Sequence, residues 1–208
     1  MDVRDEQSGL RAALAYRLTG NEAYAKKTRE YLLAVQKCKN MDVTYQRWAM
    51  VNVSVHVPKF VHAADLLEGW EGWSAADRGA FQDWACRVAY PICRRSLKEN
   101  VGGNHAWAEA ACMTFADYCW DRPDLRFRSE NQDDQAVFGA IEAYTHARQE
   151  FFNQANGNNG AAVSYNTDNF VCGQGRILWK SMIRPDGGVP DGLPLAPTPR
   201  SSCGTPSR

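Results

Sequence analysis

Apolar residues recur every three or four positions along most of the chain, which is the period of amphipathic α-helices. The first apolar stripe ends just before Gly20, in a helix-stopping position, and consists of Leu10, Ala13, Leu14 and Leu18. Asn21 is a helix-capping residue type, and a second stripe follows it over residues 24–35. The pattern predicts a helical hairpin that turns near residue 20.

Four valines, at positions 51, 53, 55 and 57, alternate with polar residues, so residues 41–57 are predicted to contain a short strand or an extended loop. Pro58 suits the first position of a following helix. Ser74 and Asp77 then form a capping-box-like start for a long helix that Pro91 should kink.

Gly102 and Gly103 interrupt the chain before a helix over residues 104–120, and the turn at 121–124 separates it from a further helix over residues 137–151. The turns near residues 20, 72 and 122 are about equally spaced, which predicts three antiparallel helical hairpins. We predict an all-α fold that resembles an incomplete α/α toroid.

The pattern changes after residue 156, where a loop rich in Asn and Gly precedes one further short helix at residues 172–183. Prolines concentrate in the last part of the chain. We therefore expect a helical domain over residues 1–183 and a Pro-rich, disordered tail over residues 184–208.

Composition narrows the range of functions. Lys and Arg total 24, and Asp and Glu also total 24, so the net charge is zero and gives no support to a nucleic-acid partner. No apolar run is long enough to span a membrane, and no signal peptide is visible at the acidic start. No cofactor or metal motif is recognised. A local basic patch could still bind a polyanion.

Seven cysteines are present without a Cys-x-x-Cys pair. Cys86 and Cys93 lie seven apart, as do Cys112 and Cys119, so each pair shares a helix face. We expect buried free thiols, with a bridge between the two helices as the alternative.

Candidate chemistry centres on the start of the helix that follows Gly102 and Gly103. Asn104 and His105 fall in its first turn, where the helix dipole favours the neutral imidazole that a general base requires. Glu109 can orient the ring, and Trp107 offers a flat surface for a sugar ring. The alternative is a capping Asn beside a hydrogen-bonded structural His. At this position we expect His105 to contribute little to core packing.

Residues 103–107, Gly-Asn-His-Ala-Trp, resemble the Asn-Asn-His-x-x-Trp element that opens a helix in the alginate lyase family of polysaccharide lyases. Gly103 replaces the first Asn, and the Trp stands one residue early. Residues 13–27 and 63–78 are similar to that family's first hairpins, and 186–191 to its Asp-Gly-x-x-Pro-x-Glu segment. The resemblance covers roughly residues 10–191 and is poor over 125–170.

The resemblance implies an α/α toroid, β-elimination on an anionic polysaccharide of the alginate or glucuronan type, and a secreted or periplasmic enzyme. It assigns Asn104 to neutralising the uronate carboxylate and His105 to the base. The family's C-terminal Arg and catalytic Tyr have no counterpart here, so we expect a departing or truncated C-terminus and a substitute acid. Tyr45 is the first candidate for that acid and Tyr165 the second. The expected substrate-binding residues are Gln46, Arg47, His56, Lys59, Trp107 and Tyr165.

Two other classes of protein remain open. A non-catalytic helical-repeat module would bind sugar or protein on its concave face. An α/α-toroid glycoside hydrolase would need two carboxylates facing each other across a cleft. The sequence identifies no such pair, and the oligomeric state is left open.

Overall fold

The computed structural model describes residues 3–41, 43, 47–100, 103–131 and 133–155. In these ranges the chain is all-α, as predicted, and the only strand-like pairing is an isolated bridge between Phe127 and Phe138. The helices are α1 (Val3–Thr19), α2 (Glu22–Val35), α3 (Arg47–His56), α4 (Pro58–Asp65), α5 (Ala75–Trp84), a π-helical turn (Ala85–Ala89), α6 (Tyr90–Glu99), α7 (Gly103–Tyr118) and α8 (Ala140–Ala155).

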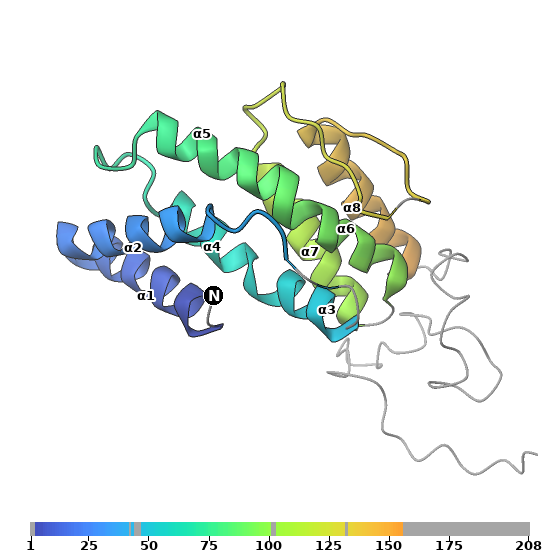
Figure 1. Ribbon diagram of the computed structural model, residues 1–208, viewed down its shortest axis with the longest axis horizontal. Coiled ribbons are helices and arrows are strands. Elements are labelled where there is room, and N and C mark those ends of the chain that lie inside the picture. Colours follow the sequence, from blue (N-terminus) through green and yellow to red (C-terminus); the bar gives the residue numbers. More distant parts are fainter. Residues whose placement is uncertain (1–2, 42, 44–46, 101–102, 132, 156–208) are drawn as a thin grey trace, which may run out of the picture.

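The helices form three hairpins, as the spacing of the turns predicts (Figure 1). The first is α1 with α2, the second is α3–α4 with α5–α6, and the third is α7 with α8. Gly20 has the positive φ of 69° that ends α1, and the Asn21 side chain accepts a hydrogen bond of 3.0 Å from the Ala23 amide. At the second turn, Ser74 Oγ accepts from the Asp77 amide at 3.1 Å.

The short strand or extended loop expected within residues 41–57 is wrong for the valines, because residues 51–56 belong to α3 and Val57 is the turn residue between α3 and α4. The buried positions over residues 50–57 are Met50, Val51, Ser54 and Val57. Buried residues three to four positions apart lie on one face of a helix, whereas a strand would bury every second residue. Packing of α3 against α6 and α7 therefore overrides the β-propensity of the valines.

The regular helix is interrupted just before Pro91, where the sequence predicts a kink. A π-helical turn, Ala85–Ala89, separates α5 from α6, and Pro91 is the second residue of α6. Pro lacks the amide hydrogen that a continuous α-helix would use, so the regular ladder is interrupted where the sequence predicts it.

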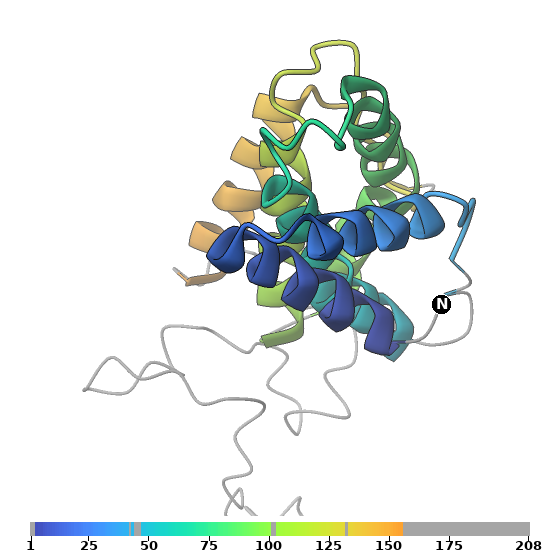
Figure 2. The same ribbon diagram turned by 90° about the vertical axis from the view of Figure 1, so that its left-hand side faces the viewer.

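Helix α7 is the central element, since it packs against α3, α4, α6 and α8. In Figure 2, α8 (orange) and the α5–α6 arm (green) stand on opposite sides of the molecule, with α1 and α2 in front. The buried side of α7 is the predicted one: Ala108, Ala111, Cys112 and Phe115, followed by Cys119 after the helix. Cys86, Cys93, Cys112 and Cys119 are buried free thiols, as expected, and burial raises the pKa of Cys86 to about 11.

Helix α8 exists where it is predicted, but its buried side is made of alanines. Ala140, Ala143 and Ala147 face α7, whereas Ile141 is 71% exposed and Tyr144 and Phe151 are also exposed. Small side chains allow close approach of the two helices, which turns the larger apolar residues outward. The domain boundary at residue 183 and the Pro-rich tail lie outside the described residues and stay predictions.

A buried ion pair fixes the connection between α7 and α8 to α6. The Arg94 guanidinium donates to both carboxylate oxygens of Asp134 at 2.8 Å, and the two side chains are almost fully buried. Arg94 also donates to the Phe127 carbonyl at 3.4 Å and lies 4.3 Å from the centre of the Phe138 ring. One side chain thus holds three points of the long connection in place.

Replacing Asp134 with Ala leaves the Arg94 charge buried without its partner, so we expect a loss of about 3–5 kcal/mol in the free energy of unfolding. The double variant Arg94→Met/Asp134→Ala should recover most of this loss. As a control, Glu30→Ala breaks the exposed pair with Lys27 and should cost less than about 1 kcal/mol. Urea unfolding measures all three, and equal losses for Asp134→Ala and Glu30→Ala would contradict the prediction.

Candidate functional site

The N-terminal ends of α3 and α7 lie at the same end of the molecule. Helices α5 and α6 follow α3–α4 along the chain and return in the opposite direction. Helix α7 then runs in the same direction as α3–α4 and packs beside them (Figure 1). The first turns of these helices carry Arg47 and Asn104, which are far apart in sequence. The fold therefore brings two predicted site regions to one end.

Two exposed tryptophans mark this end. Trp107 is the fifth residue of α7 and 52% exposed, and Trp48 is the second residue of α3 and 67% exposed. Tryptophan is enriched at binding surfaces, where its ring offers a large flat apolar face. Trp48 was missed by the sequence reasoning, although its position directly after Arg47 was a signal that could have identified it.

Asn104 is half-buried in the first turn of α7. Among the described residues, none forms a hydrogen bond with its side-chain amide. The unpaired amide hydrogens at the N-terminus of a helix make this position favourable for an anion. Asn104 is therefore available to a carboxylate.

His105 lies beneath this position and is only 1% exposed. Its Nδ1 is 3.3 Å from the carbonyl oxygen of Asn100, which can only accept, so Nδ1 carries the proton in this contact. Its Nε2 is 2.7 Å from Oε1 of Glu109, one turn further along α7. That approach is close but not aligned as a hydrogen bond. Nδ1 is thus engaged by the Asn100 carbonyl, whereas Nε2 faces the Glu109 carboxylate without an aligned hydrogen bond.

Glu109 is completely buried, and its carboxylate oxygens have no aligned hydrogen-bond partner in the described part of the chain. Burial raises the pKa of the Glu109 carboxyl above its usual value of 4.5, and the contact with His105 opposes this rise. The Glu109 carboxyl is therefore easier to protonate in the folded protein than in water.

The buried contacts continue from His105 to the end of α6. The Asn100 side chain donates to Oγ of Ser96 at 2.7 Å and to the Ser96 carbonyl at 3.2 Å. Ser96, Asn100, His105 and Glu109 are all buried. We call these four residues the buried polar chain. It connects the last turn of α6 to the first two turns of α7.

This geometry corrects one expectation. His105 is among the largest fully buried side chains, so its first-turn position does not mean that it contributes little to packing. A general base also needs a nitrogen that faces the substrate. In the structure Nδ1 faces Asn100 and Nε2 faces Glu109.

The other predicted residues are only partly placed. Tyr45, Gln46 and Tyr165 lie outside the described residues, and Arg47 is described only as the first residue of α3. His56 and Lys59 meet at the junction of α3 and α4, where Nδ1 and Nζ are 3.1 Å apart. That junction is roughly 13 Å along the axis from Arg47, so it does not bring them to the α7 terminus.

Comparison with known proteins bears on this arrangement. A family model described as alginate lyase matches residues 3–144, which include all three hairpins up to the start of α8. The chain belongs to the alginate lyase family. Neither the curated proteins nor the solved structures give a significant match. The chain is accordingly a member of a polysaccharide lyase family.

Two further observations concern the described residues alone. No helix among them is long and apolar enough to cross a bilayer. No three or more His, Cys, Asp or Glu side chains in the described ranges are grouped so that they could hold a metal ion.

Replacing Glu109 with Gln tests the buried carboxyl. Because the folded protein binds the Glu109 proton more tightly than the unfolded chain, this group stabilises the fold at low pH, and that contribution is lost as pH rises from 4.5 through the raised pKa. The stability of Glu109→Gln relative to the wild type should therefore increase with pH over this range. Urea unfolding at several pH values measures it. A difference in stability between Glu109→Gln and the wild type that does not change with pH would contradict the assignment.

Proposed function

We propose that this protein cleaves a uronate-containing polysaccharide, of the alginate or glucuronan type, by β-elimination. The observation that carries the proposal is the match to the alginate lyase family over residues 3–144. Within that match, the start of α7 combines an available Asn104 with the exposed ring of Trp107. The partner is an anionic polysaccharide.

Elimination requires that the charge of the uronate carboxylate be compensated, because the proton at C5 beside it is only weakly acidic. The Asn104 amide donates to that carboxylate, and the positive end of the α7 dipole adds to the effect. As the C5 proton leaves, negative charge develops on the carboxylate oxygens. Donors fixed in place before the reaction stabilise this charge best.

The remaining steps move two protons. A base takes the C5 proton, the electron pair forms the C4–C5 double bond, and the C4–O bond breaks as an acid protonates the leaving oxygen. We assign the base to His105, which requires that substrate binding turn Nε2 away from Glu109. Tyr45 is assigned as the acid and Arg47 as a carboxylate ligand. His56, Lys59, Gln46 and Tyr165 are assigned to more distant parts of the polymer.

Activity on a panel of polyuronates tests the function, since elimination produces an unsaturated uronate that absorbs in the near ultraviolet. Asn104→Ala should lower kcat/KM by about 10²–10³-fold, as expected for loss of one donor to developing charge. The control is Ala110→Ser, an exposed position on the same helix, which should leave activity unchanged. No unsaturated product from the wild type on any polyuronate would contradict the proposal.

His105→Gln tests the base with less disturbance of the core than Ala would cause, because Gln retains much of the volume and a donor for the Asn100 carbonyl. The variant should lose about 10²–10⁴ in kcat while its unfolding curve stays close to that of the wild type. Full activity in a folded His105→Gln variant would show that another group is the base.

Trp48 and Trp107 are expected to contact the sugar rings. An oligouronate should quench or shift tryptophan emission, and Trp48→Ala and Trp107→Ala should each remove part of this response and weaken binding severalfold. Unchanged affinity in both variants would place the substrate elsewhere on the molecule.

A further inference from the structure

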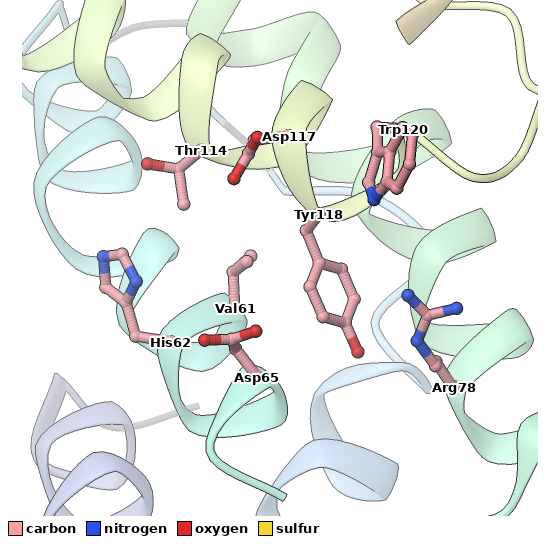
Figure 3. A pocket seen from close by; sticks show the side chains of 8 residues that line it. All are labelled: Val61, His62, Asp65, Arg78, Thr114, Asp117, Tyr118 and Trp120. Carbon is pink, nitrogen blue, oxygen red and sulfur yellow. The ribbon is translucent and has the colours of Figure 1, made fainter. Parts of the chain in front are cut away.

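A pocket lies near the C-terminal end of α7 (Figure 3). It has a volume of about 250 Å³ and is lined by Val61, His62, Asp65, Arg78, Thr114, Asp117, Tyr118 and Trp120. Thr114 and Asp117 are ten and thirteen residues beyond Asn104, which places them roughly 15–20 Å along the helix axis. The pocket is therefore separate from the proposed lyase site.

One wall of the pocket is held rigidly. Arg78 donates from Nε to Glu68 at 2.7 Å and from Nη1 to Asp121 at 2.5 Å, and its guanidinium lies 5.5 Å from the centre of the Tyr118 ring. Gln82 holds the other oxygen of Asp121 at 2.9 Å. The positive charge of Arg78 is thus already balanced by two carboxylates and is not free for an anion.

The other charged groups of the pocket are acidic. Asp65 on α4 and Asp117 on α7 are exposed, and no cation pairs with either of them in the described part of the chain. Figure 3 shows both carboxylates on the pocket wall, with His62 and Thr114 beside them. Asp117 also lies in the last turn of α7, whose dipole favours a cation. The pocket therefore repels a uronate and attracts a positive group.

Trp120 provides an apolar face at the edge of the pocket. It is 68% exposed, and together with Asp117 it also lines a neighbouring pocket of about 220 Å³ bounded by Ala140, Ile141 and Tyr144. An exposed indole beside unpaired carboxylates can stack on the C–H face of a sugar ring while the carboxylates bind its polar groups. Each pocket is below the usual size of a drug-like site and suits a single ring.

From these observations we propose that the pocket formed by α4, α7 and Trp120 binds an amino sugar, with its protonated amine held by Asp65 and Asp117 and its ring on Trp120. The site would engage a positively charged or neutral sugar unit at the opposite end of α7 from the uronate. It does not depend on the proposed lyase activity, since none of its residues belongs to the machinery for elimination.

Titration of the full chain with four small probes, followed by NMR of the tryptophan indole N–H signals, tests the proposal. The probes are glucosamine, methyl glucoside, glucuronate and putrescine, and Trp120→Phe identifies the Trp120 signal. Glucosamine should shift this signal at the lowest concentration, methyl glucoside at a higher one, and glucuronate should leave it in place.

Two variants and one control separate the contribution of the Asp117 charge to binding from that of the Trp120 ring. Asp117→Asn should weaken glucosamine binding by about two- to fivefold, as for a partly exposed ion pair, while methyl glucoside binding changes little. Trp120→Ala should weaken both sugars. Asp133→Asn, an exposed carboxylate that does not line the pocket, is the control and should change neither.

Three results would overturn the proposal. Glucuronate binding as well as glucosamine would contradict the charge argument. Putrescine binding as tightly as glucosamine would show that the ring is not recognised. A Trp120 signal that no probe shifts would show that the pocket is not a sugar site. Loss of lyase activity, by contrast, has no bearing on any of these outcomes.

Discussion

The buried polar chain, from Ser96 through Asn100 and His105 to Glu109, fixes where α7 begins relative to the end of α6. Polar groups are costly to remove from water unless other polar groups lie close to them, so few arrangements of the two helices are favourable. Asn104 stands beside His105 and takes its position from this contact. The geometry of the proposed lyase site therefore depends on groups that no substrate touches.

The two ends of α7 differ in electrostatic character. Its first turn offers unpaired amide hydrogens and Asn104, which favour an anion. Its last turn carries Asp117, which lines the same pocket as Asp65 of α4, and these two carboxylates favour a cation. Helix α7, which is central to the packing of the domain, thus provides one surface that favours an anion and another, roughly 20 Å away, that favours a cation.

The hairpins were predictable because their signals are local. Gly20, Asn21 and Ser74 mark helix ends through backbone conformation and capping, which depend on a few neighbouring residues. The burial of Ala108, Cys112 and Phe115 likewise follows from helical periodicity. The family resemblance, carried by residues 103–107 and the first hairpins, is confirmed by the family match.

Other features depend on contacts between helices, which the pattern of apolar and polar residues along the chain does not reveal. Three of the alternating valines, Val51, Val53 and Val55, are helical because α6 and α7 pack against α3. Ile141 and Tyr144 face outward because alanines form the contact of α8 with α7. His105 is buried next to Glu109, one turn further along α7. Trp48 is exposed because of where α3 lies in the fold. The roles of the individual site residues stay predictions.

The most direct test is to locate a uronate on α7 itself. In the His105→Gln variant, where cleavage is expected to be slow, an oligouronate can be titrated while the side-chain amide signal of Asn104 is followed by NMR. The account predicts that the Asn104 signal shifts together with the indole signals of Trp48 and Trp107, and that the Trp120 signal stays in place. A shift at Trp120 with an unchanged Asn104 would contradict it.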